Sequence, residues 1–391
     1  MLKKKLLSLA AILGFMSIVW AGNLKLKVYN PGSKAIFAVT STIIYGDKDA
    51  MLVDAQFQKQ YAEQLVREIK ATGKNLTTVF ISHSDPDFYF GLDVIKKAFP
   101  HVKIISTAQT AYLISASKDD KMAVWKPQLK ADAPSEIIVP EAVTAIPDLE
   151  GHPIEIRQNP EDPAHSFLWI PSLKTVAGGI SVSTGSHLWM ADTQNAKAID
   201  HWIGQIDAMK ALQPAQVIPS HFAEQSLSPQ SLDFVKNYLE DYKKAVAENK
   251  TSPAIVDFMV KKYPDLPGKE ELEMGVKVFL GAMDWDLKSP FPAIGKKVEV
   301  DFGTVKFLLD FKDNKTMTFV GTAGSSKNST DTVQYTAVEI AKNIFMVYWH
   351  EPNLGFNVTH IQDYNKNIVY SNIAGPDGTF THPKGSLKIL K

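Results

Sequence analysis

The residues with the clearest chemical potential lie in one short segment, HSDPDFYFG, which begins at His83. Its imidazole and carboxylate groups, His83, Asp85 and Asp87, alternate along the chain directly after a short apolar run. In an extended loop, alternate side chains point to the same side, and nitrogen and oxygen groups placed in this way are typical metal ligands. The alternative is a capped loop, in which Asp85 and Asp87 bind backbone amides ahead of a helix that begins at Leu92.

Two further histidines stand at the ends of apolar runs far along the chain. His165 immediately precedes the run 166–170, and His221 immediately follows the run 216–219. Each of them alone is more often a loop histidine with an ordinary hydrogen bond than a metal ligand. Three histidines at strand ends in one α/β chain together favour a metal site.

Three other side chains are candidates for contacts with a substrate. Tyr89 directly follows the metal-ligand segment and is expected to form the floor of a cleft. His187 and Trp189 lie in the segment 182–192. If this segment leads into a loop beside the site, His187 approaches the metal and Trp189 walls the pocket. The alternative is that the pair fixes a loop by packing and one hydrogen bond.

The elements expected around these residues alternate between strands and helices over residues 35–283. Apolar β-branched runs bounded by turn residues indicate strands, and amphipathic stretches with a glycine or proline near their ends indicate helices. The alternation predicts an α/β packing in which buried strands deliver polar loops to a site. Strands are predicted at 35–45, 50–53, 77–82, 103–106, 166–170, 175–177 and 216–219, and helices at 58–71, 92–98, 200–212, 230–248, 255–263 and 270–283.

The pattern changes beyond residue 250, and two prolines and a glycine within 284–295 indicate a linker. From there onward short strands follow one another, separated by turn signals such as Lys312-Asp313-Asn314. About eight antiparallel strands in roughly 100 residues suit a small closed barrel better than an open sheet. They are predicted at 298–302, 305–311, 316–320, 332–339, 344–349, 358–364, 368–372 and 386–390.

Composition and the N-terminus restrict the function further. Lys plus Arg and Asp plus Glu both number 42, so no excess charge attracts nucleic acid or an anionic membrane. The chain has no cysteine, which excludes disulfides and thiolate metal sites. Lys3 to Lys5 followed by an apolar run to Trp20 have the order of a signal peptide, with cleavage expected after Ala21. We therefore expect a periplasmic or secreted protein, without membrane attachment after cleavage and with a small molecule as its substrate.

The segment at His83, together with His165, the HLWMAD sequence at 187–192 and the Pro-Ser-His ending at His221, resembles the metallo-β-lactamase superfamily from about Leu24 to Trp285. The resemblance implies an α+β fold, a four-layered αββα sandwich with metals at one edge of the inner strands. In the family, two Zn²⁺ or Fe ions activate a hydroxide that attacks an ester, lactone, amide or phosphoester.

The family motif His-x-His-x-Asp-His is altered here. Asp85 stands at the second histidine position, Phe88 at the last one, and Gly179 where the bridging carboxylate is expected. Carried over position by position, the resemblance implies a first metal site of His83, Asp85 and His165. The second site keeps Asp87 and His221, and Asp87 is the expected catalytic group that orients a water or takes its proton. The resemblance implies one zinc ion as the cofactor, with a second zinc ion or iron as the alternatives. The double change Phe88→His with Gly179→Asp would restore the missing ligands, so it is expected to raise the metal stoichiometry from about one to about two.

The last 100 residues resemble the MoaF-like domain, a lipocalin-like barrel, over about 294–390. The resemblance rests on the segments YWHE at 348–351, VTHIQDY at 358–364 and IVYSNIAGPDG at 368–378. The chain is thus divided into a signal peptide (1–21), a metallo-β-lactamase-like domain (22–287) and a β-barrel domain (288–391).

Three classes of function remain open. The first is an exported metal-dependent hydrolase with a degenerate site. The second is a protein that keeps the scaffold, has little or no turnover and binds a small ligand. The third is a redox or oxygen-binding metalloprotein, which is disfavoured because no flavin module is visible. Metal content separates the first two, since about one equivalent of zinc or iron favours the hydrolase.

Overall fold

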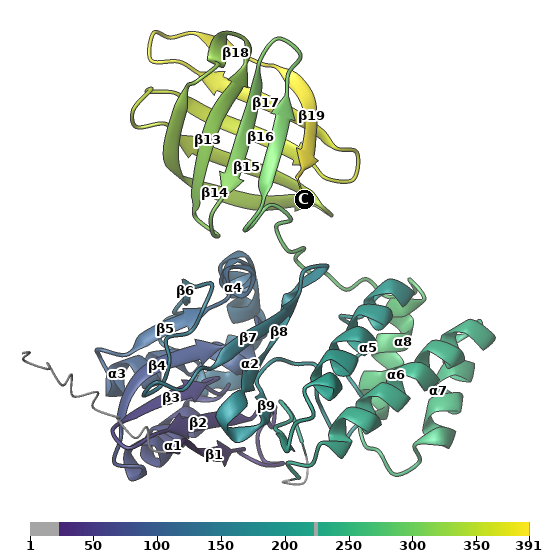
Figure 1. The fold of residues 1–391 in the computed structure, drawn as a ribbon. Helices are drawn as coiled ribbons and strands as arrows, with labels where there is room; N and C mark the ends of the chain where they lie inside the picture. The colour runs from purple at the N-terminus through teal and green to yellow at the C-terminus, as the bar shows by residue number, and fades with distance from the viewer. Residues whose placement is uncertain (1–22, 223–225, 391) are drawn as a thin grey trace, which may run out of the picture.

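The computed structural model describes residues 23–222 and 226–390, and the expected signal peptide lies outside them. Figure 1 shows a β-barrel above a larger domain of two sheets, with a group of helices beside the second sheet. Within the described residues, no helix is both long and apolar enough to cross a membrane.

The first sheet has six strands in the order of the chain. Strands β1 to β3 pair antiparallel, and β3 to β6 pair parallel. Its helices are α1, the single turn α2, α3 and α4. The strands are β1 (Lys25–Tyr29), β2 (Ser41–Tyr45), β3 (Asp49–Val53), β4 (Asn75–Ile81), β5 (Lys103–Ser106) and β6 (Glu141–Ala142), and the helices are α1 (Lys59–Ala71), α2 (Pro86–Tyr89), α3 (Leu92–Ala98) and α4 (Ala108–Leu129).

The second sheet has four strands in the order β10-β9-β8-β7. Helices α5 to α8 lie beside this sheet (Figure 1), and the last of them precedes the linker to the barrel. The strands are β7 (Glu155–Asn159), β8 (Asp162–Ile170), β9 (Thr175–Ala177) and β10 (Gln216–Val217), and the helices are α5 (Ala196–Ala211), α6 (Gln230–Glu248), α7 (Ser252–Lys262) and α8 (Lys269–Phe279).

The alternation of side chains along the strands explains the layers. In β3, Leu52 packs toward α1 and α3, whereas Met51 and Val53 face the core between the two sheets. In β8, Leu168 faces the same inter-sheet core, whereas Phe167 packs with α5 and α6. Successive side chains of a strand point to opposite faces, so each of these apolar runs is buried on both sides. The result is the predicted αββα sandwich.

The C-terminal strands close into a barrel. The order runs β16-β15-β14-β13-β12-β11-β19-β17, and β16 also pairs with β17, so the ring of eight strands has no free edge. All eight predicted strands are present, and β18 is an additional short strand. They are β11 (Lys297–Asp301), β12 (Lys306–Phe311), β13 (Thr316–Ala323), β14 (Thr330–Ala341), β15 (Ile344–His350), β16 (Asn357–Asp363), β17 (Ile368–Ala374), β18 (Phe380–Thr381) and β19 (Lys384–Ile389).

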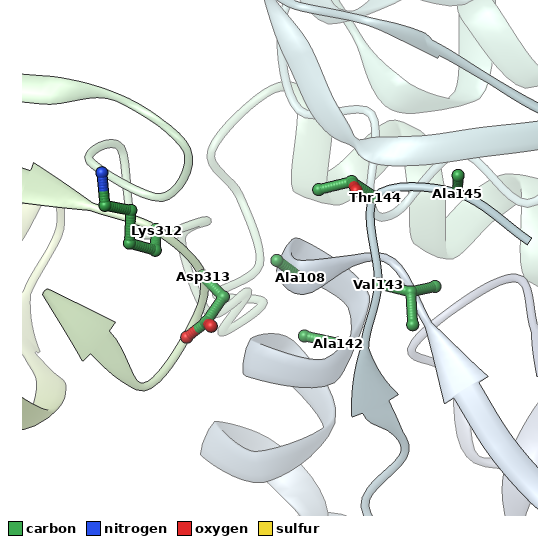
Figure 2. Close-up of a pocket in the computed structure, with 7 residues that line it drawn as sticks. All are labelled: Ala108, Ala142, Val143, Thr144, Ala145, Lys312 and Asp313. Carbon is green, nitrogen blue, oxygen red and sulfur yellow. The ribbon is translucent and has the colours of Figure 1, made fainter.

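Helix α4 packs against both domains. Tyr112 and Leu113 pack into the core of the barrel, while Ile114 belongs to the core beneath the first sheet. Gln109 Nε2 donates a hydrogen bond to the carbonyl oxygen of Phe291 in the linker, at 2.8 Å. A hollow of about 350 Å³ lies beside the start of α4, lined by segment 142–145 and, on the barrel side, by Lys312 and Asp313 (Figure 2). The barrel is therefore packed against the sandwich rather than only tethered to it.

The structure differs from the predicted elements in several places, and β1, α2, β6 and β7 were not predicted. Strand β2 begins at Ser41 rather than at residue 35, because the preceding segment turns, with the amide of Ala35 bonded to the carbonyl of Gly32. Strand β8 begins at Asp162, so His165 lies within the strand rather than before it. The 22-residue helix α4 was not predicted at all.

Candidate functional site

The site lies where β4 ends, and a buried carboxylate fixes this strand end. Asp54, which follows β3 with a left-handed backbone (φ 62°), accepts hydrogen bonds from the amide of Ser82 at 2.8 Å and from its hydroxyl at 2.7 Å. The Ser82 hydroxyl in turn accepts from the amide of Gly179 at 2.7 Å. Burial raises the pKa of Asp54 from 3.8 to about 7. This network holds the chain that delivers His83 against the chain that follows β9.

The first group of candidate residues gathers around Asp85. His83 Nε2 lies 3.3 Å from Asp85 Oδ2, and the His83 and His165 rings are stacked with centroids 5.6 Å apart. On the other side, Lys121 Nζ from α4 donates to Asp85 Oδ1 at 3.0 Å and to the carbonyl of Ser84 at 2.7 Å. Burial alone would raise the pKa of Asp85, but the Lys121 ammonium and His83 hold it well below its usual range.

His165 is oriented by a carboxylate on its own strand. Its Nδ1 donates to Asp162, with the two carboxylate oxygens 2.8 and 2.9 Å away. Burial lowers the pKa of His165, but the hydrogen bond and charge of Asp162 outweigh it, so the net pKa is raised. Since Nδ1 is taken, Nε2 is the ring nitrogen left for a substrate, a water or a metal.

The second group consists of Asp87 and His221. His221 Nε2 donates to Asp87 Oδ2 at 2.8 Å, and its Nδ1 lies 3.1 Å from the hydroxyl of Ser220. The Phe88 ring stands between the two groups, with centroids 5.3 Å from His83 and 5.8 Å from His221. The five predicted ligands therefore fall into the two sets that the sequence implied, separated by a phenyl ring.

A pair of tryptophans holds a further, half-buried carboxylate near the first group. Trp189 Nε1 and Trp285 Nε1 each donate to Asp192 at 2.7 Å, one to each oxygen. Burial raises the pKa of Asp192, and the negative charge of Asp85 raises it further. Trp285 comes from the linker before the barrel, so this linker contributes directly to the surroundings of the site.

The local backbone differs from the predicted extended loop. Residues Pro86–Tyr89 form a single helical turn, with Asp85 at its N-cap position in extended conformation and a proline at the first helical position. Proline suits this position because its fixed φ is helical and the missing amide would be unpaired there. Asp85 and Asp87 therefore leave the chain from a helix start rather than from one side of an extended strand.

Two of the predicted substrate-binding residues are buried instead. Tyr89 is 1% exposed and packs in the core with Phe90, which is 5.3 Å away between ring centroids. His187 is 4% exposed, and its Nδ1 lies 2.9 Å from the hydroxyl of Tyr238. Burial lowers the pKa of His187. His187 has a packing role, whereas Tyr89 lies close to Asp85 and Asp87: burial raises the pKa of its phenol, and the charges of these two carboxylates raise it further. Trp189 lies beside the site through its hydrogen bond to Asp192.

The arrangement of donors does not fit the metal ion that the resemblance implies. Within residues 23–222 and 226–390, no three His, Asp or Glu side chains are grouped so that they could hold one ion. A metal-binding histidine almost always donates its second ring N–H to a partner, whereas His83 Nδ1 is buried without one. Gly179 cannot be the site of a bridging carboxylate, because a Cβ there would lie 2.1 Å from the carbonyl oxygen of Ser166. The predicted zinc or iron therefore stays a prediction.

Four site residues were absent from the sequence-based set: Lys121, Asp162, Asp192 and Trp285. Asp162 stands three residues before His165, and Asp192 ends the segment that contains Trp189, so both could have been found from their neighbours in the sequence. Lys121 and Trp285 carry no such signal, because only the packing of α4 and of the linker brings them to the site.

Comparison with known proteins supports both domains. Residues 36–221 match the model of the metallo-beta-lactamase superfamily, and residues 294–388 match the MoaF-like model. The chain is 21% identical over 103 residues to an uncharacterized protein of Bacillus subtilis, a match that covers 26% of this chain and 44% of the relative, less than half of its length.

Among solved structures, a beta-lactamase domain protein from Burkholderia ambifaria has a TM-score of 0.48 at 11% identity, covering 65% of this chain and 84% of that protein. A metallo-beta-lactamase from Pseudomonas aeruginosa in its mono-zinc form has a TM-score of 0.39 at 17% identity, covering 56% and 91%.

The sandwich is thus similar to the metallo-beta-lactamase superfamily over residues 36–221, and the barrel that follows it is similar to the MoaF-like domain over residues 294–388. The predicted fold class is confirmed. The match to the metallo-beta-lactamase superfamily supports a hydrolase as the class of enzyme.

Proposed function

We propose that the protein is an exported hydrolase that cleaves a small ester, lactone, amide or phosphoester at the site around His83 and His165. The observation that carries this proposal is the pair His165–Asp162, in which a carboxylate 2.8 Å from Nδ1 leaves Nε2 free on a side chain that is 34% exposed. The expected partner is a small molecule, and neither nucleic acid nor a membrane is required.

The pair has the arrangement of a general base. A carboxylate that binds Nδ1–H fixes the tautomer in which Nε2 accepts a proton, and it stabilises the imidazolium that forms. In the proposed reaction, a water oxygen attacks the carbonyl carbon or phosphorus while its proton moves to His165 Nε2. The bond to the leaving group then breaks, and the leaving group takes up the proton. Asp87, held by His221, is the second group proposed to orient the water or move a proton.

The main test is turnover of a panel of aryl esters, lactones and aryl phosphodiesters by the wild-type protein and by His165→Gln. We expect a loss of about 100-fold in kcat/KM in the variant, the lower end of the range for a general base. His101→Ala, a change at an exposed histidine outside the site, serves as the control and should leave kcat/KM unchanged.

Equal turnover by wild type and His165→Gln would reject His165 as the base. No turnover of any panel member by the wild type would favour the alternative, a scaffold that binds a small ligand without hydrolysing it.

Export is tested separately. If the first 21 residues are a signal peptide, the periplasmic fraction of a bacterial host should contain a species that begins at Gly22, identified by intact-mass measurement. Detection of only the full-length chain, in the cytosolic fraction, would contradict export without affecting the site.

A further inference from the structure

The position of Lys121 is enforced by helix α4 and is not a chance surface pairing. Upstream of Lys121, Tyr112 and Leu113 are anchored in the barrel core. Downstream, Leu129 is buried in the core beneath the first sheet, and Trp125 packs edge-on against Phe57 with ring centroids 5.3 Å apart. A helix held on both sides of Lys121 presents its ammonium at a defined place.

The ammonium is bound by two oxygens of the site. Lys121 Nζ donates to the Ser84 carbonyl at 2.7 Å and to Asp85 Oδ1 at 3.0 Å, and its side chain is 25% exposed. The Asp85 carboxylate thus lies between an imidazole on one oxygen and an ammonium on the other. Its negative charge is already balanced by a protein cation.

The spacing on the imidazole side is that of two ligands of one ion. Two ligand atoms about 2.1 Å from a tetrahedral ion are separated by about 3.4 Å, and His83 Nε2 and Asp85 Oδ2 are 3.3 Å apart. This pair alone therefore keeps the spacing of two ligands at the family's first metal position, although no third His, Asp or Glu is grouped with it within the described residues. A divalent ion placed there would lie close to the Lys121 ammonium, which repels it and competes for the same carboxylate.

We propose that the Lys121 ammonium takes the place of the first metal ion, so that the wild-type protein binds no divalent ion at His83, Asp85 and His165. The inference rests on the proposed function only in placing the site at these residues. It makes the hydrolysis independent of metal, with Lys121 as a positioning residue that holds the Asp85 carboxylate in place.

The experiment measures metal content rather than activity. Wild type, Lys121→Met, Lys121→Arg and Lys118→Met are incubated with excess ZnCl₂, desalted and measured by elemental mass spectrometry. Lys121→Met removes the charge at similar length, Lys121→Arg keeps it, and Lys118→Met removes a lysine on the same helix whose ammonium pairs with its neighbour Asp119. We expect less than about 0.1 zinc per chain in all but Lys121→Met, and an increase of about tenfold in that variant.

Adding His83→Ala to Lys121→Met should reverse the gain, which would place the new zinc at this site. One equivalent of zinc in the wild type that His83→Ala removes would overturn the proposal. An equal gain of zinc in Lys121→Arg and Lys121→Met would also overturn it, because side-chain shape and not charge would then matter. A Lys121→Met protein that has the circular dichroism of the wild type but gains no zinc would overturn it as well. If Lys121→Met does not fold, Lys121→Gln replaces it.

The zinc and turnover measurements can reject the two proposals independently of each other. A wild-type protein that is free of metal and hydrolyses the panel, with a rate unchanged by EDTA, supports both proposals. A metal-free and inactive protein rejects hydrolysis and leaves the role of Lys121 standing. An active protein that loses its turnover together with bound zinc rejects the role of Lys121 and leaves hydrolysis standing.

Discussion

Replacing Gly179 by aspartate is expected to destabilise the sandwich domain by about 4 kcal/mol, or to prevent folding, instead of supplying a bridging metal ligand. Gly179 has φ 76°, and an added Cβ would lie 2.1 Å from the backbone oxygen of Ser166. A backbone atom cannot rotate away as a side chain can, so β8 or the segment after β9 must move. Such a movement also strains the hydrogen bond from the Gly179 amide to Ser82.

The matched control is Gly151→Asp. Gly151 also has a left-handed backbone, with φ 82°, but a Cβ added there would have no atom within 4 Å. That variant carries the conformational cost alone, which is on the order of 1 kcal/mol. Chemical denaturation of both variants gives the comparison. A Gly179→Asp protein as stable as Gly151→Asp would contradict the predicted clash, and the double change with Phe88→His could then create the second site that the family resemblance suggests.

Replacing Asp54 by alanine is expected to lower the free energy of unfolding by about 3 kcal/mol. The change leaves the amide and hydroxyl of Ser82 without their acceptor in a buried position. It also places alanine at φ 62°, where aspartate and asparagine are tolerated better. Because Ser82 precedes His83, turnover should fall together with stability. A loss below about 1 kcal/mol in urea denaturation would show that the network contributes little.

Asp54→Asn tests the ionisation of the same group. The folded-state pKa of about 7 lies above the usual 3.8, so the folded protein holds a proton that the unfolded chain releases between these values. This contribution to stability is fully present below pH 3.8 and is lost as the pH rises through about 7. The nearby Asp87 carboxylate favours the protonated form further. Relative to wild type, Asp54→Asn should therefore become less destabilising from about pH 4 to about pH 7, and a constant difference would contradict the raised pKa.

Much of the fold follows from patterns that lie close together in the sequence. All eight barrel strands were predicted, because short apolar runs follow one another there and turn residues separate many of them. Helix α3 and strands β5 and β9 were predicted to the residue, since their apolar runs end at clear polar or glycine boundaries. The chemistry-bearing segment at His83 could also be recognised, because its residues are local.

Helix α4 shows where the sequence pattern was insufficient. A surface helix is recognised by one apolar stripe, but α4 buries residues on several sides, among them Gln109, Thr110, Tyr112 and Ile114. It does so because it packs against both the sandwich and the barrel. No periodic face is left in its sequence, and Lys121 on this helix therefore gave no sign of its position beside Asp85.

The sequence by itself determined the two domains, the segment after β4 that carries His83, and the departures from the family motif. The tertiary structure alone decided which polar side chains meet at the site. Lys121 lies beside Asp85, and Trp285 beside Asp192, although 36 and 93 residues separate the members of these pairs. The lack of space for a side chain at Gly179 also arises from tertiary packing, since the backbone oxygen that blocks it belongs to Ser166 in β8. Such contacts depend on how elements distant in the chain pack, and no local pattern of residues encodes them.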